Sequence, residues 1–327
     1  MRDNRTDALR RALLAVTAAL ALHLPAPAAP AQETGWPRTI KHAAGEITLA
    51  AKPARIVSTS PSLTGILLAI DVPIVATAAT TPSGLTDGKG YFSQWAEVAD
   101  ARGVAVLYSN LNFDIESVIG WNPDLLIVSA GGADTALQHY PELRAQGIPT
   151  IVVNYFNRPW QEIATEIGRA TGHEAEAAAA IRRFDDYAAG VAPSITPPAG
   201  PVTIVGYNLA GTYSVSRTTS PHAQILKALG FEVAGLPEHI RADPAYRGSD
   251  FGFVSRETLS SAIAGETVFL LNGTEKDVET FLADPVLANL PAVRNRRVYP
   301  LGPTSFRVDY YSGRQLIDTV AGYFRKS

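Results

Sequence analysis

The chain has 327 residues, of which 46% are hydrophobic and 18% are charged, and its formal net charge at pH 7 is −3. This composition is typical of a globular protein rather than a disordered one, and the length allows two ordinary domains. The charge balance argues against a nucleic-acid partner, because such proteins normally carry a basic surface. The sequence has no cysteine, which excludes disulfides, thiol catalysis and anchoring through a lipidated N-terminal cysteine.

The pattern of residues 1–31 predicts a secretory signal peptide. Four arginines precede an apolar run over 12–22, and small residues lead to an A-x-A-like cleavage site after Ala31. The run is shorter than the roughly 20 residues that span a bilayer, and a permanent N-terminal anchor is the alternative. Cleavage would remove four arginines and two aspartates and change the net charge from −3 to −5. We therefore expect residues 32–327 to be free in the periplasm.

Residues 32–158 are predicted to form an N-terminal α/β lobe. Short apolar runs rich in β-branched residues alternate there with helix-like segments. Continuous apolar strands separated by helices indicate βαβ units and a parallel sheet. The runs cover residues 55–58, 74–77, 124–129 and 150–154.

Residues 159–190 are predicted to form a connecting helix. Apolar and small residues recur there every three or four positions in a stretch rich in Ala, Glu and Arg. If continuous, about 28 residues at ~1.5 Å each would extend roughly 42 Å, a length that suits a rod between two lobes. Gly172 interrupts the pattern, and two ordinary helices are the alternative.

Residues 191–327 are predicted to form a second α/β lobe. A Pro-rich linker over 192–201 is followed by apolar runs and by helices over 222–229 and 310–324. The predicted fold is therefore α/β, with two α/β lobes joined by a long connecting helix. This architecture behind a signal peptide favours an extracytoplasmic binding protein that holds its ligand in the cleft between the lobes.

The sequence lacks the common signatures of catalysis and of metal binding. It has neither a G-x-S-x-G elbow nor a G-x-x-x-x-G-K-[ST] phosphate loop, and no histidine pair has the spacing of a zinc site. We expect no catalytic residue, no metal site in the protein and no cofactor. A metal site assembled from His139, His222 and His239 is the alternative.

Cationic, aromatic and hydroxyl side chains follow several predicted strands, where they would face the cleft. Such groups suit a large chelated anion, since the weakly hydrated, planar guanidinium of arginine binds oxygens well when desolvated. The candidate ligand-binding residues are Ser60, Lys89, Tyr207, Tyr213, Arg217 and Arg307.

Several of these candidates have a purely structural alternative. A plain helix N-cap is the alternative for Ser60, a solvated cation for Lys89 and a salt bridge with Asp309 for Arg307. Trp95 is a further candidate for a cleft wall, with a place in the core as its alternative.

The segment 56–71 (IVSTSPSLTGILLAID) closely resembles the periplasmic ferric enterobactin-binding protein family. The resemblance continues through 79–82 (ATTP), 122–125 (NPDL) and 306–312 (FRVDYYS), and it spans about residues 36–324. It implies a class III periplasmic binding protein, with a shallow cleft between two lobes on a rigid helix. It further implies a monomer that captures a ferric catecholate siderophore, which itself holds the iron, and that delivers it to an inner-membrane ABC permease.

The resemblance also implies a docking role for two glutamates, Glu116 and Glu257, because family members present one glutamate per lobe to arginines of the permease. Carboxylates stabilising helix starts are the alternative. The chain departs from the family at Ser216, where a tryptophan can stand, and over 83–90, which is one residue shorter with Lys89 as its only cation. These departures leave open another catecholate, a bis-catecholate or a mixed siderophore. Haem or cobalamin is the alternative ligand, and a siderophore-processing hydrolase is the least favoured reading.

Overall fold

The computed structural model describes residues 35–326, and Pro37–Ser327 form one compact unit. The predicted signal peptide and its cleavage site lie outside the described residues. Within residues 35–326, no helix combines the length and the apolar character that crossing a membrane requires.

The first lobe is built on a five-stranded sheet of order β5-β4-β3-β6-β7, in which every neighbouring pair is parallel. The strands are short and mostly buried on both faces, as expected for a parallel sheet covered by helices. The strands are β3 (Ile56–Ser58), β4 (Ile74–Thr77), β5 (Ala105–Val106), β6 (Leu125–Ser129) and β7 (Thr150–Val153); the helices are α2 (Pro61–Ala69), α3 (Ala96–Ala101), α4 (Ile115–Trp121) and α5 (Tyr140–Ala145). A hairpin of β1 (Arg38–His42) and β2 (Gly45–Leu49) lies beside β7.

The second lobe contains a five-stranded sheet of order β10-β9-β8-β11-β12. Strands β8, β11 and β12 are parallel to one another, and β9 is antiparallel to both of its neighbours, β8 and β10. Its strands are β8 (Val202–Leu209), β9 (Thr212–Ser216), β10 (Phe251–Val254), β11 (Thr267–Leu270) and β12 (Val298–Pro300); its helices are α8 (Pro221–Ala228), α9 (Arg256–Ala262), α10 (Glu275–Leu282), α11 (Pro291–Arg294) and α12 (Tyr310–Phe324). The first strand of each sheet is flanked on both sides by later strands. In a parallel sheet, such as that of the first lobe, the position where the strand order reverses opens a crevice at the carboxyl ends of the strands.

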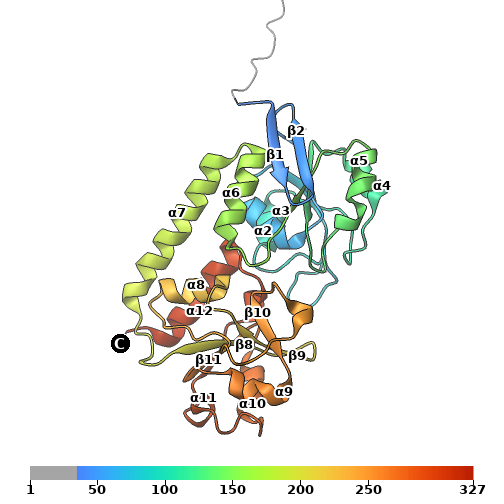
Figure 1. The fold of residues 1–327 in the computed structure, drawn as a ribbon. Coiled ribbons are helices and arrows are strands. Elements are labelled where there is room, and N and C mark those ends of the chain that lie inside the picture. The colour runs from blue at the N-terminus through green and yellow to red at the C-terminus, as the bar shows by residue number, and fades with distance from the viewer. Residues whose placement is uncertain (1–34, 327) are drawn as a thin grey trace, which may run out of the picture. The chain divides into compact units, whose positions relative to one another are not determined.

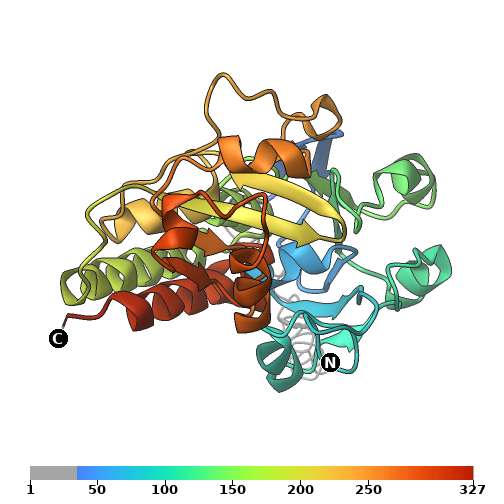
Figure 2. The same ribbon diagram turned by 90° about the horizontal axis from the view of Figure 1, so that it is seen from below.

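The predicted connecting segment consists of two helices, the alternative left open by the sequence. Helix α6 (Trp160–Thr171) ends at Gly172, whose φ of 71° is left-handed, and α7 (Glu174–Val191) follows. Helix α7 alone, with 18 residues, joins the lobes; it extends about 27 Å at ~1.5 Å per residue. Figure 1 shows α7 running from beside the first lobe to the second, and Figure 2 shows the C-terminal helix α12 alongside it. The predicted fold of two α/β lobes joined by a helix is confirmed.

The lobes also meet directly, through α2 and the start of α12. The buried carboxylate of Asp309 caps α12, accepting hydrogen bonds from the backbone N–H groups of Tyr311 and Ser312 at 2.8 and 2.9 Å. It also accepts a hydrogen bond from Gln94 Nε2 of the first lobe at 3.2 Å, and burial raises its pKa. Trp95 is fully buried against this contact, so its alternative place in the core is the one observed.

Candidate ligand-binding cleft

A cavity of about 240 Å³ lies between the two lobes, at the carboxyl ends of their strands. The first lobe contributes α2 and the segment after β7, and the second contributes the β8–β9 hairpin, the start of β10 and the segment before α12. Most of the walls are aromatic or aliphatic, and a few polar groups lie among them, as is usual for small-molecule sites. The lining includes Tyr155, Phe156, Arg158, His222, Asp250 and Arg307.

Arg307 is the sequence-predicted candidate that the structure places in this cavity. Its guanidinium carbon lies 4.1 Å from the centre of the Tyr155 ring, a cation–π contact between the two lobes. Within residues 35–326 its side chain makes no hydrogen bond and no ion pair, and its Nε is buried without a partner. The expected salt-bridge alternative with Asp309 is therefore not observed, because that carboxylate caps α12. The Arg307 charge remains available to a ligand.

Ser60 has a different role from the one expected. Its side chain is fully buried, and its hydroxyl donates a 2.5 Å hydrogen bond to Asp134 Oδ2. The backbone N–H of Ser62 donates to the same oxygen at 3.1 Å, and the Tyr155 hydroxyl donates to Asp134 Oδ1 at 2.8 Å. The N-terminus of α2 thus binds a carboxylate of the protein itself. Neither the hydroxyl of Ser60 nor this helix end is free to hold an external anion.

Tyr207 and Tyr213 lie on the face of the second sheet that is turned away from the cavity. Side chains alternate along a strand, so Thr212 and Ser214 line the cavity while Tyr213 packs on the opposite core. Tyr207 packs on that core as well, with its ring 5.1 Å from Phe281. Its hydroxyl donates to Asp284 at 2.8 Å, and burial together with this bond raises its pKa. The structure therefore does not bring the two tyrosines to Arg307.

The other two cationic candidates are held by the protein. Arg217 lies beside the cavity. Its Nε donates a hydrogen bond to the backbone carbonyl of Ser249 at 3.0 Å, and its backbone N–H donates to the backbone carbonyl of Asp250 at 2.9 Å. Lys89 is ion-paired with Asp100 and lies 3.6 Å from Asp87, and it does not line the cavity. Arg217 therefore supports a wall of the site, whereas Lys89 belongs to a surface cluster.

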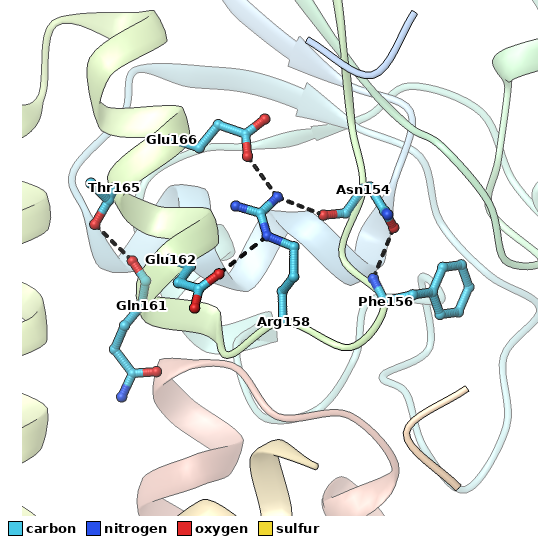
Figure 3. Close-up of polar contacts among 7 residues, drawn as sticks. All are labelled: Asn154, Phe156, Arg158, Gln161, Glu162, Thr165 and Glu166. Carbon is cyan, nitrogen blue, oxygen red and sulfur yellow. Dashed lines mark hydrogen bonds and ion pairs between the residues drawn. The ribbon is translucent and has the colours of Figure 1, made fainter. Parts of the chain in front are cut away.

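Several lining residues with charged or aromatic side chains were not predicted from the sequence, among them Arg158 and Phe156. Arg158 follows β7 and donates to Glu166 at 2.6 Å, to the Asn154 carbonyl at 2.9 Å and to Glu162 at 3.5 Å, as Figure 3 shows. Phe156 lies on the same turn, held by a 3.0 Å bond from its backbone N–H to Asn154 Oδ1. The signal that was available is their position: both follow the predicted strand over 150–154.

Two ionisable side chains in the cavity were also missed. His222 donates from Nε2 to the Ser305 carbonyl at 2.6 Å, its Nδ1 is buried without a partner, and burial lowers its pKa to about 4. Asp250 is half-buried, and burial raises its pKa while the nearby charges of Arg307 and Arg217 act in the opposite direction. The cavity therefore holds a neutral imidazole and a carboxylate beside its arginine.

Glu116 and Glu257 are exposed and lie one in each lobe. Glu116 is in the first turn of α4 and Glu257 in the first turn of α9, positions that also fit the structural alternative of carboxylates at helix starts. In residues 35–326, no three His, Asp or Glu side chains are grouped so as to hold a metal ion.

Comparison with known proteins agrees with this architecture. The periplasmic binding protein family matches residues 56–304. The ferric enterobactin-binding periplasmic protein FepB of Escherichia coli O6:H1 is 40% identical over 297 residues, covering 90% of this chain and 92% of FepB. The solved structure of holo-ViuP has a TM-score of 0.82 and 36% identity, covering 89% of this chain and 96% of that one. Staphylococcus aureus SirA complexed with staphyloferrin B shares the fold at a TM-score of 0.67 and 18% identity, over 89% of this chain and 100% of SirA. The resemblance recognised in the sequence is confirmed, and the chain belongs to the periplasmic binding protein family.

Proposed function

We propose that this protein is the periplasmic substrate-binding component of an ABC transporter, that it captures a ferric siderophore of the catecholate type, and that it delivers the complex to an inner-membrane permease. The observation that carries the proposal is the Arg307 guanidinium, which has no hydrogen-bonding partner among the described residues and lies on the aromatic wall of the cleft. A catecholate chelate combines negative charge with flat rings. An arginine beside aromatic side chains matches both features.

The similarity to FepB supports the same class of ligand, because that relative is a ferric enterobactin-binding periplasmic protein. The cleft supports capture rather than turnover. Catalysis through a covalent intermediate needs a nucleophile with a base positioned beside it. The imidazole that lines the cavity, His222, is bonded through Nε2 to the Ser305 carbonyl, and its Nδ1 has no hydrogen-bond partner among the described residues.

The proposal is tested with the chain 32–327 by titration of its intrinsic tryptophan fluorescence. Ferric enterobactin, ferrichrome, haemin and cobalamin are each added, and Trp36, Trp95, Trp121 and Trp160 supply the signal. We expect saturable quenching at submicromolar concentration by the catecholate complex, and recovery of the siderophore unchanged after release. A response to haemin or cobalamin alone would contradict the proposed ligand, and release of cleaved siderophore would contradict the binding role.

The variant Arg307→Ala connects the function to the cleft. Losing a desolvated charge that contacts an anion costs ~2–5 kcal/mol, so affinity for ferric enterobactin should fall by about 30-fold or more. Arg296→Ala is the matched control, because Arg296 is an exposed arginine paired with Glu279 on the surface of the second lobe. Equal affinities of the two variants would place the ligand elsewhere.

A further inference from the structure

We infer that the cleft selects its ligand by charge, and that Asp250 makes it favour a ferric catecholate carrying fewer negative charges than a trianionic tris-catecholate. This inference rests on the proposed function and narrows its substrate class.

Asp250 is the one carboxylate among the residues that line the cavity in the described part of the chain. It lies immediately before β10, and the backbone N–H of Arg217 donates a hydrogen bond to its carbonyl at 2.9 Å. Asn157 from the first lobe donates from its side-chain amide to the Gly248 carbonyl. The contact with Gly248 ties the segment before β10 to the first lobe, which limits the movement of Asp250 when an anion enters.

The arginines around the cavity are matched by carboxylates. Arg158 lines the cavity but is paired with both Glu162 and Glu166. Arg307 then remains among the lining arginines, and Asp250 is the lining residue of opposite charge.

The side chains that line the cavity therefore carry no net positive charge, because Arg158 is paired with its two glutamates and the formal charges of Arg307 and Asp250 sum to zero. Lys89, the cation of the shortened loop 83–90, adds nothing, since it is held by Asp87 and Asp100. A site for a trianion would be expected to carry an excess of cations.

The physical consequence follows from Coulomb's law. Iron(III) bound by three catecholate dianions is a trianion, whereas iron(III) bound by two is a monoanion. At equal distance, Asp250 repels the trianion about three times as strongly as the monoanion.

The experiment compares two ferric ligands on the chain 32–327. One is ferric enterobactin, and the other is the ferric complex of a synthetic chelator with two 2,3-dihydroxybenzamide arms on an uncharged alkyl linker. Each is titrated against the unsubstituted protein, Asp250→Asn and the control Asp186→Asn, which removes an exposed carboxylate on α7. Asp250→Asn removes the charge and keeps the size of the side chain, and a thermal melt checks that the fold is kept.

We expect the unsubstituted protein to bind the two-armed chelate at least tenfold more tightly than ferric enterobactin. Asp250→Asn should raise the affinity for ferric enterobactin at least fivefold and that for the two-armed chelate by less, whereas Asp186→Asn should change neither. Tighter binding of ferric enterobactin by the unsubstituted protein would overturn the inference while leaving the proposed function intact, and so would an equal effect of Asp250→Asn on both ligands. Failure of both chelates to bind would overturn the proposed function itself.

Discussion

The guanidinium of Arg307, in the second lobe, lies over the ring of Tyr155, in the first, with 4.1 Å between the guanidinium carbon and the ring centre. The hydroxyl of Tyr155 in turn donates to Asp134, which is bound to the start of α2. One tyrosine therefore links the cation proposed to hold the ligand to the buried polar network of the opposite lobe. Different substitutions of Tyr155 can remove the hydroxyl alone or the whole aromatic ring.

Tyr155→Phe should keep the affinity for ferric enterobactin within about twofold and lower the free energy of unfolding by about 1–3 kcal/mol, because Asp134 loses one donor. Tyr155→Leu should in addition weaken binding about tenfold, since a cation–π contact contributes ~1–2 kcal/mol. Fluorescence titration and urea unfolding measure the two effects separately. If the leucine variant bound as tightly as the phenylalanine variant, the ring would have no part in positioning Arg307.

Ser60→Ala should destabilise the protein without weakening ligand binding. The buried carboxylate of Asp134 loses a hydroxyl donor at 2.5 Å, which costs about 1–3 kcal/mol of unfolding free energy. Urea unfolding gives the stability, and titration with ferric enterobactin gives the affinity. A large loss of affinity in a variant of unchanged stability would show that Ser60 contacts the ligand after all.

Glu116→Ala combined with Glu257→Ala should abolish siderophore uptake by cells while leaving binding by the purified protein unchanged, if these exposed carboxylates meet cations of the permease. The matched control is Glu97→Ala combined with Glu275→Ala, which removes exposed carboxylates from the first turns of α3 and α10. Uptake of labelled ferric siderophore is the measurement. Normal uptake in the first double variant would refute the docking role.

Gly65→Ala should loosen the contact between the lobes. A Cβ at this position of α2 would lie 2.5 Å from Asp309 Oδ2 and 2.9 Å from Trp95 Cδ1, so the packing must shift at a cost of about 1–3 kcal/mol. Gly190→Ala in α7 is the control, because its Cβ would have no neighbour within 4 Å, and it should stabilise the helix by roughly 0.5–1 kcal/mol. Thermal unfolding compares the two variants. Equal melting temperatures would mean that the α2–Asp309 contact tolerates the extra carbon.

Stability should fall as the pH drops from about 6.5 to about 4, through His222. Burial lowers the pKa of this histidine from 6.5 to about 4 in the folded protein, so over this range the unfolded chain binds the extra proton. The contribution of neutral His222 to the free energy of unfolding is complete above pH 6.5, and about 3 kcal/mol of it is lost by pH 4. His222→Gln keeps a donor for the Ser305 carbonyl and removes the titration, and urea unfolding across this range should show a smaller loss for the variant. Identical pH profiles would assign the acid sensitivity to other groups.

Local pattern was enough to predict several of the helices and strands. The apolar run over 124–129 is the buried strand β6, and the helix predicted over 310–324 is α12. Gly172 was recognised as an interruption, and its left-handed φ is what ends α6. These features depend on residues a few positions apart, so they are visible in the chain itself. The family motifs likewise predicted the two-lobe architecture.

The site depended on partners that are distant in the chain. Ser60 is bonded to the carboxylate of Asp134, which lies 74 residues away in the chain. No local sequence pattern predicts this contact, which gives the hydroxyl of Ser60 a partner within the protein. Tyr213 lies within β9 rather than in a loop after a strand, and only the packing of the sheet decides which face of that strand meets the cleft. The sequence by itself thus determined the two lobes, several of their elements and one arginine that lines the cavity. The tertiary structure decided which other charges line the cavity, because burial and pairing between distant segments determine which side chains remain exposed to it.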